Sequence, residues 1–189
     1  FLTFDNAQRV VIGAWEHGGR FNASPYRSPD APANPTLPGQ WREMLRFFDA
    51  HLKDAGNGAP IEKALHYYTR GEETWKRTPV WPPEGTTVQR WYLAGSQRLS
   101  QTKPDAENGA DSYVVDFEAT TGEYNRWWEM GVIEDKTVVY GDRAEADQRL
   151  LTYTSRPLSK DTEITGYPIV TLYVTSTAED GAFHVYLED

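Results

Sequence analysis

A chain of 189 residues with 39% apolar residues is long enough for one domain or two small ones and apolar enough to build a core. Its 19 basic and 28 acidic side chains leave a net charge of −9 without any cluster of lysine and arginine, which argues against a nucleic acid or an anionic membrane as partner. The sequence has no cysteine, which excludes disulfides, thiolate metal sites and cysteine nucleophiles and leaves the cytoplasm and the secreted space equally open. No stretch approaches the roughly 18 consecutive apolar residues that a membrane-spanning helix needs.

The first predicted element is a strand at Arg9–Trp15, a short continuous apolar run typical of parallel strands that are buried on both faces. A long loop follows from Glu16 to Gly39, because Gly18-Gly19 and five prolines prevent regular structure there. The sequence opens at Phe1 without a methionine and reaches the strand almost at once. We therefore expect the natural N-terminus, with any signal peptide, to lie outside this sequence.

An amphipathic helix is predicted over Gln40–Lys53. Its apolar side chains recur at helical spacing along one face, at Trp41, Met44, Leu45, Phe48 and Leu52. The pattern changes at residues 54–60, which are rich in glycine and polar residues. Strand, loop and helix in this order are typical of α/β proteins. We therefore expect residues 1–58 to be the end of one domain and residues 59–189 to belong to another.

The second zone is predicted to be all-β. It contains short segments rich in β-branched and aromatic residues, at Ile61–Tyr68, Val88–Leu93, Tyr113–Phe117, Thr137–Tyr140, Leu150–Thr154, Ile169–Thr175 and Phe183–Leu187. In the last two segments apolar and polar side chains alternate, which indicates one buried face and one wet face. Several such strands with irregular connections predict an antiparallel β-sandwich of the jelly-roll type.

His17 is the residue most open to a catalytic interpretation. It closely follows the predicted parallel strand, which places it at the carboxyl end of the sheet, where open α/β sheets bind ligands. From position alone, a loop histidine that hydrogen-bonds a neighbouring carbonyl is the commoner case. A catalytic histidine also needs a nucleophile and a carboxylate, and no serine of this sequence lies in the G-x-S-x-G pattern of a nucleophile elbow. If His17 is catalytic, its partners lie elsewhere.

The segment from Val11 to Gly18, VIGAWEHG, resembles the motif around the catalytic histidine in a family of serine hydrolases. That family includes X-Pro dipeptidyl-peptidases, cocaine esterase and α-amino-acid ester hydrolases. Three later landmarks agree in order, at Trp41–Leu52, at Trp75 with Trp81-Pro82-Pro83, and at Leu151–Pro168. Ala14 stands where family members usually have proline, a departure that alters the stiffness of the loop and not the chemistry. The resemblance covers nearly the whole chain.

The resemblance implies both a fold and a role. Residues 1–58 would be the last strand, histidine loop and last helix of an α/β-hydrolase domain, and residues 59–189 would be part of a C-terminal jelly-roll β-sandwich. His17 would be the general base of a Ser-His-Asp triad whose other members lie upstream. The full-length protein would be an esterase or peptidase that transfers the acyl group of an ester or X-Pro dipeptidyl bond to water, and this segment alone would be inactive. Its partners would be a small ester or peptide substrate and the remainder of the hydrolase chain, with a homo-oligomer left open.

A non-catalytic interpretation also stays open. A jelly-roll module that binds carbohydrate or mediates assembly would use exposed aromatic side chains. Trp127 and Trp128 are the pair of interest, because adjacent strand residues point to opposite faces and only one of them can be core. In a complete enzyme the other could form a wall of the substrate cleft. No pair of histidines shows the spacing of metal ligands, so neither a metal nor a cofactor is predicted.

Overall fold

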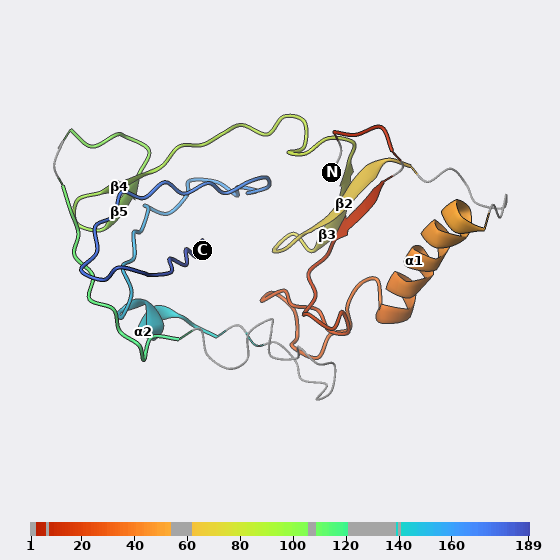
Figure 1. The fold of residues 1–189 in the computed structure, drawn as a ribbon, viewed down its shortest axis with the longest axis horizontal. Coiled ribbons are helices and arrows are strands. Elements are labelled where there is room, and N and C mark those ends of the chain that lie inside the picture. The colour runs from red at the N-terminus through yellow and green to blue at the C-terminus, as the bar shows by residue number, and fades with distance from the viewer. Residues whose placement is uncertain (1–2, 7, 54–61, 106–108, 121–138, 140) are drawn as a thin grey trace.

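The computed structural model describes residues 3–6, 8–53, 62–105, 109–120, 139 and 141–189 of the chain (Figure 1). Its elements, in chain order, are β1 (Arg9–Ile12), α1 (Leu37–Leu52), β2 (Ala64–Thr69), β3 (Thr74–Thr78), β4 (Tyr92–Ala94), β5 (Arg98–Ser100) and α2 (Ala144–Asp147). The described strands form a three-stranded sheet of order β1-β2-β3 and a two-stranded sheet of β4 and β5. In Figure 1 the larger sheet and α1 lie at one end of the molecule, and β4, β5 and α2 lie at the other.

The three-stranded sheet is built around β2. β1 runs parallel to β2, with Val10 opposite Leu65, and β3 returns antiparallel along the other edge of β2. A strand with neighbours on both edges has its backbone groups satisfied. β2 also contains two of the most buried residues of the described chain, Ala64 and Leu65, which are 0% and 3% exposed. The buried apolar residues of the described chain are Ala23, Ala33, Ala64, Leu65, Tyr67 and Ala94.

β1 is parallel, as predicted, but within this chain it is not buried on both faces as predicted. Val11 is 36% exposed and Ile12 is 47% exposed. Burial on both faces needs a packed layer on each side of the sheet, and among the described helices and strands only β2 lies against the backbone of β1. The β1–β2 pairing also joins the segments before and after residue 58, where the predicted domain boundary lies.

α1 begins at Leu37, three residues before the predicted Gln40, and ends at Leu52. Pro38 lies in the first turn, where a fixed φ suits the helix and the missing N–H costs nothing. The predicted apolar face is present but uncovered, since Trp41 and Phe48 are 53% and 50% exposed and no residue of the helix is buried. Within the described residues, no helix combines the length and the apolar character needed to cross a bilayer.

A polar contact attaches α1 to the sheet. Arg9 of β1 pairs with Glu43 of α1 at 2.9 Å, and a second guanidinium nitrogen of Arg9 lies 3.4 Å from Nε2 of His66 on β2. Burial, and then the positive charge of Arg9, lower the pKa of His66 from its ordinary value. The helix is therefore held to the strands by charge on one side while its apolar stripe stays open.

The part of the chain after residue 62 is β-rich, as predicted, although its described residues form fewer and shorter paired strands than expected. β2 confirms the predicted segment Ile61–Tyr68 over most of its length, whereas β4 overlaps the predicted segment Val88–Leu93 only at Tyr92 and Leu93. The segment at 150–154 contributes a single bridge, from Thr154 to Arg98. The described segments 113–117, 169–175 and 183–187 carry no ladder pairing, and the faces predicted to be buried are open, with Val170 51% and Val185 57% exposed. An alternating pattern specifies which face is apolar, but burial requires a neighbouring strand or layer to cover it.

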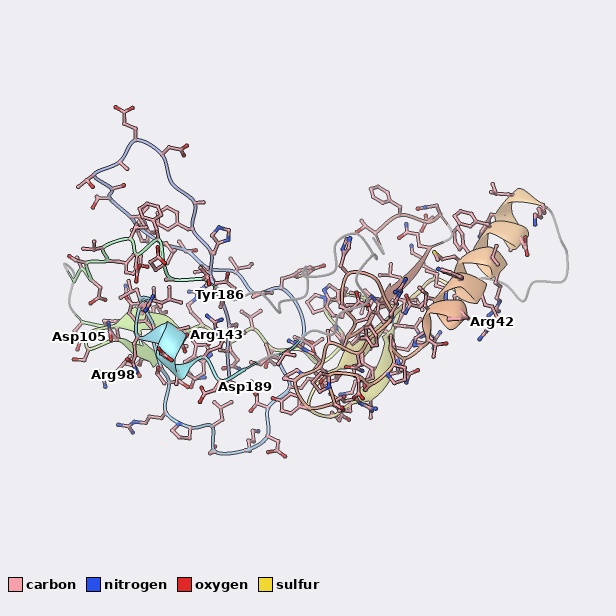
Figure 2. All side chains as sticks on the ribbon, turned by 90° about the horizontal axis from the view of Figure 1, so that it is seen from below. Arg42, Arg98, Asp105, Arg143, Tyr186 and Asp189 are labelled. Carbon is pink, nitrogen blue, oxygen red and sulfur yellow. The ribbon has the colours of Figure 1, made fainter. Side chains whose placement is uncertain are left out.

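Polar contacts join distant segments in the second part of the chain, and Figure 2 shows two of the residues concerned, Arg143 and Tyr186, close together. Tyr153 donates to Asp111 at 2.5 Å, and its burial together with this carboxylate raises the pKa of Tyr153 to about 12. Arg143, just before α2, pairs with Glu188 at 2.6 Å and lies 5.4 Å from the centre of the Tyr186 ring. These contacts bring segments together that are far apart in sequence without forming an apolar core.

Candidate functional site

The candidate site is the loop that follows β1 and carries His17. An antiparallel bridge between Trp15 and Asn22 closes this loop. Backbone hydrogen bonds on both sides of the bridge support it, from Ala23 N–H to the carbonyl of Ala14 at 2.9 Å and from Glu16 N–H to the carbonyl of Phe21 at 3.3 Å. The loop is therefore a tight structure with His17 near its tip.

Glu16 fixes the loop from the inside. Its side chain is 1% exposed, and its two carboxylate oxygens accept hydrogen bonds from three backbone N–H groups. One oxygen accepts from Arg20 at 2.5 Å and from Phe21 at 3.1 Å, and the other accepts from Gly18. An ionised carboxylate only accepts hydrogen bonds, so it suits a pocket formed entirely by N–H donors.

The start of α1 fastens the far side of the loop. Gly19 adopts a φ of +73°, and a Cβ at this position would lie 2.8 Å from Oε1 of Gln40. The Nε2 group of Gln40 donates to the carbonyl of Gly19 at 2.8 Å and to that of Pro35 at 3.0 Å. Only glycine fits this backbone comfortably, which explains the second glycine of the pair after His17.

A second carboxylate joins the end of the loop to the hairpin of β2 and β3. Glu73 accepts hydrogen bonds from Ser24 at 2.7 Å and from Arg27 at 2.6 Å on the loop side. On the hairpin side it accepts from Tyr68 at 3.1 Å and from Gly71 N–H at 3.0 Å. Burial works to raise the pKa of Glu73, but the donors, led by Ser24 and Arg27, outweigh it and lower that pKa from the ordinary value of 4.5.

We expect Glu73→Gln to destabilise the fold in a pH-dependent way. Because the folded pKa of Glu73 is lowered, its contribution to stability is present above the unfolded pKa and is lost as the pH falls through the folded pKa. The variant should lose about 1 kcal/mol of unfolding free energy at pH 7, and the loss should shrink in more acidic solution. Urea unfolding at several pH values measures this difference, with Glu179→Gln at an exposed carboxylate as control. Equal losses at pH 7 and at pH 3 would contradict this role of Glu73.

Aromatic rings line the sheet beside the loop. The ring centres of Trp15 and Trp75 lie 6.1 Å apart, and those of Tyr68 and Trp75 lie 5.3 Å apart. The Trp15 ring folds back over Gly13, where an added Cβ would collide with it. Glycine at position 13 therefore lets the Trp15 ring lie against the backbone directly after β1.

The structure places His17 after the carboxyl end of β1, and its side chain is exposed. The catalytic role of His17 stays a prediction. Trp127 and Trp128 lie outside the described residues, so the proposed cleft wall stays a prediction too. Among the described residues, no group of three or more His, Asp and Glu side chains could hold a metal ion.

The sequence analysis missed Glu16, Gln40 and Glu73. Glu16 left a signal, because an acidic residue at the start of a glycine-rich loop can accept hydrogen bonds from the loop amides. No sequence pattern indicated Gln40 or Glu73, because their partners are distant in sequence and only the fold brings them together. An exposed imidazole on a loop braced in this way can take a proton from, and return it to, a group that approaches from the open side.

The structure consists of a segment that carries His17 and a β-rich part that follows it. Comparison with known proteins identifies the family. Residues 57–189 match the X-Pro dipeptidyl-peptidase C-terminal non-catalytic domain. The chain therefore belongs to the X-Pro dipeptidyl-peptidase and cocaine esterase family, which confirms the resemblance seen in the sequence. His17 lies before the matched range and so outside the domain described as non-catalytic.

Alignments with named relatives cover all or nearly all of the chain. It is 43% identical over 190 residues to "Putative serine esterase Mb1866c" of Mycobacterium bovis and to "Putative serine esterase MT1883" of Mycobacterium tuberculosis, covering 100% of this chain and 29% of each relative. It is 26% identical over 206 residues to "Cocaine esterase" of a Rhodococcus species, covering 98% of this chain and 34% of that relative. No solved structure matches the chain significantly. The chain thus spans less than a third of the length of the mycobacterial relatives.

Proposed function

We propose that this chain contributes the general base, His17, to a longer serine hydrolase that cleaves ester or amide bonds. The observation that carries the proposal is the position of His17, which is exposed and lies on a loop at the carboxyl end of β1. Hydrogen bonds from the side chains of Glu16 and Gln40 hold this loop. The mycobacterial relatives, whose names describe them as serine esterases, align with the whole chain including this loop. In the proposed enzyme a serine attacks the carbonyl, His17 takes its proton and returns it to the leaving group, and water releases the acyl group.

The proposed architecture is the one that the resemblance in the sequence implies. Residues 1–58 would end an α/β-hydrolase domain, and residues 59–189 would form part of a jelly-roll sandwich. The open faces of β1 and α1 favour this proposal, because an apolar strand and an apolar helix face normally pack against another layer. The remainder of the hydrolase domain is the layer that would cover them. The match of residues 57–189 to a non-catalytic domain agrees with a division at about this point.

A fluorophosphonate probe tests the class of enzyme. We expect the longer protein that contains this chain to react at a single serine, because the hydroxyl displaces fluoride from phosphorus only where a base activates it. Peptide mapping by mass spectrometry should place the label in a G-x-S-x-G segment outside residues 1–189. His17→Ala should prevent labelling, whereas His184→Ala, at an exposed histidine, should not. A label on a serine of this chain, or labelling that survives His17→Ala, would refute the assignment.

A further inference from the structure

We propose that Glu16 is the positioning residue of His17, with its buried carboxylate holding the backbone on both sides of the histidine. This inference rests on the proposed function of His17 as a general base. It assigns to Glu16 no contact with substrate and no part in proton transfer. Its role is to fix the direction in which the imidazole leaves the loop.

The hydrogen bonds of Glu16 bracket the histidine. The N–H of Gly18, which belongs to the peptide group directly after His17, donates to the Glu16 carboxylate. On the other side, the N–H of Glu16 donates to the carbonyl of Phe21 at 3.3 Å. The carbonyl of Glu16 in turn accepts from Gly19 N–H at 3.1 Å. Because these contacts fix the backbone at both neighbours of His17, the orientation of its ring depends mainly on its own two side-chain torsions.

A carboxylate is the group that this pocket requires. Three backbone N–H groups donate to the two oxygens, so both oxygens must act as hydrogen-bond acceptors. A glutamine of the same shape would turn an NH₂ group toward at least one of these donors, and that backbone N–H would lose its acceptor. A buried donor without a partner costs more than an ordinary hydrogen bond contributes. The loop should therefore open even though the volume of the side chain is unchanged.

Such opening should affect the rate of the reaction more than the binding of substrate. A general base acts only when its nitrogen lies within hydrogen-bond reach of the proton that it removes, and small displacements lower the rate strongly. Substrate contacts made elsewhere would keep their geometry. A loss in kcat with little change in KM is the signature of this positioning role.

The test compares Glu16→Gln with Glu84→Gln, at an exposed glutamate on another loop, in the longer protein that contains this chain. Hydrogen exchange followed by mass spectrometry reads the peptide that contains residues 18–21, and hydrolysis of a p-nitrophenyl ester gives kcat and KM. We expect Glu16→Gln to speed exchange in that peptide by roughly ten- to a hundredfold. Exchange in β2 and β3 should stay as in the wild type, and kcat should fall at least about tenfold with KM within about twofold.

Two results would overturn the inference. The first is an exchange rate at residues 18–21 that Glu16→Gln leaves unchanged. The second is a kinetic effect of Glu16→Gln that is confined to KM, or a fall in kcat that Glu84→Gln reproduces. If Glu16→Gln does not fold, Glu16→Asp takes its place under the same criteria, since its carboxylate is one methylene too short to reach all three donors. A wild-type protein that exchanges slowly at residues 18–21 but hydrolyses neither a p-nitrophenyl ester nor an X-Pro p-nitroanilide would refute the proposed function, while the exchange measurements would still decide whether Glu16 holds the loop.

Discussion

His17→Ala in the longer protein that contains this chain should lower kcat for ester hydrolysis by roughly 10⁴- to 10⁶-fold. The loss is this large because the members of a catalytic triad work as a unit, and a serine without its base does not form the acyl-enzyme at a useful rate. KM should change little, because the imidazole contributes to the transition state more than to substrate binding. Steady-state kinetics on a p-nitrophenyl ester, with a fresh preparation of each variant, measures both constants.

The matched control for this experiment is His184→Ala. His184 lies in the exposed C-terminal part of the chain, far in sequence from the loop of His17. Its replacement should leave kcat within about twofold of the wild type, as for most surface substitutions away from a site. Comparable losses in the two variants would mean that neither histidine is the base, and the hydrolytic role of this chain would have to be abandoned.

Leu65→Ala should destabilise the fold by about 2–5 kcal/mol. Leu65 is 3% exposed and lies in β2, opposite Val10 of β1 and Thr78 of β3. Truncating it leaves a cavity at the centre of the only described sheet with three strands, where the backbone cannot easily collapse to fill the space. Because β1 leads directly into the loop of His17, resistance of the activity to heat should fall together with the unfolding midpoint in urea.

Val88→Ala is the companion measurement for Leu65→Ala. Val88 is 93% exposed, so its truncation removes almost no buried surface. The variant should unfold within about 0.5 kcal/mol of the wild type. If both variants cost the same, β2 would not be the centre of the stable part of the chain.

The sequence predicted local features well. The helix at α1 carries an apolar pattern of helical period, the strand at β1 is a short apolar run, and the strand at β2 is rich in aromatic residues, and the structure contains all three. The start of α1 was predicted three residues late, because Pro38 counted as part of the loop although it suits a first helical turn. His17 was found because a histidine and two glycines directly after a strand form a local motif.

Long-range pairing could not be predicted in the same way. Alternation in residues 169–175 shows which side chains share a face, but it does not name the strand that covers them. The contacts of Glu73 with Ser24 and Arg27 join segments that only the folded chain brings together. Burial of β1 and α1 depends on layers beyond their own residues, and no local pattern contains that information.

The hairpin turn at residues 70–73 has a consequence for engineering the protein. Surface turns between two strands are common places to insert a tag, graft a peptide or shorten a chain, because such changes rarely disturb anything else. Here Gly71 adopts a φ of +86° and Glu73 a φ of +58°, and the Glu73 carboxylate is shared with the segment that follows the histidine. A redesign of this turn would therefore disturb the segment that carries Ser24 and Arg27, which follows the loop of the proposed base, and a library that varies these four positions should be screened for turnover as well as for solubility.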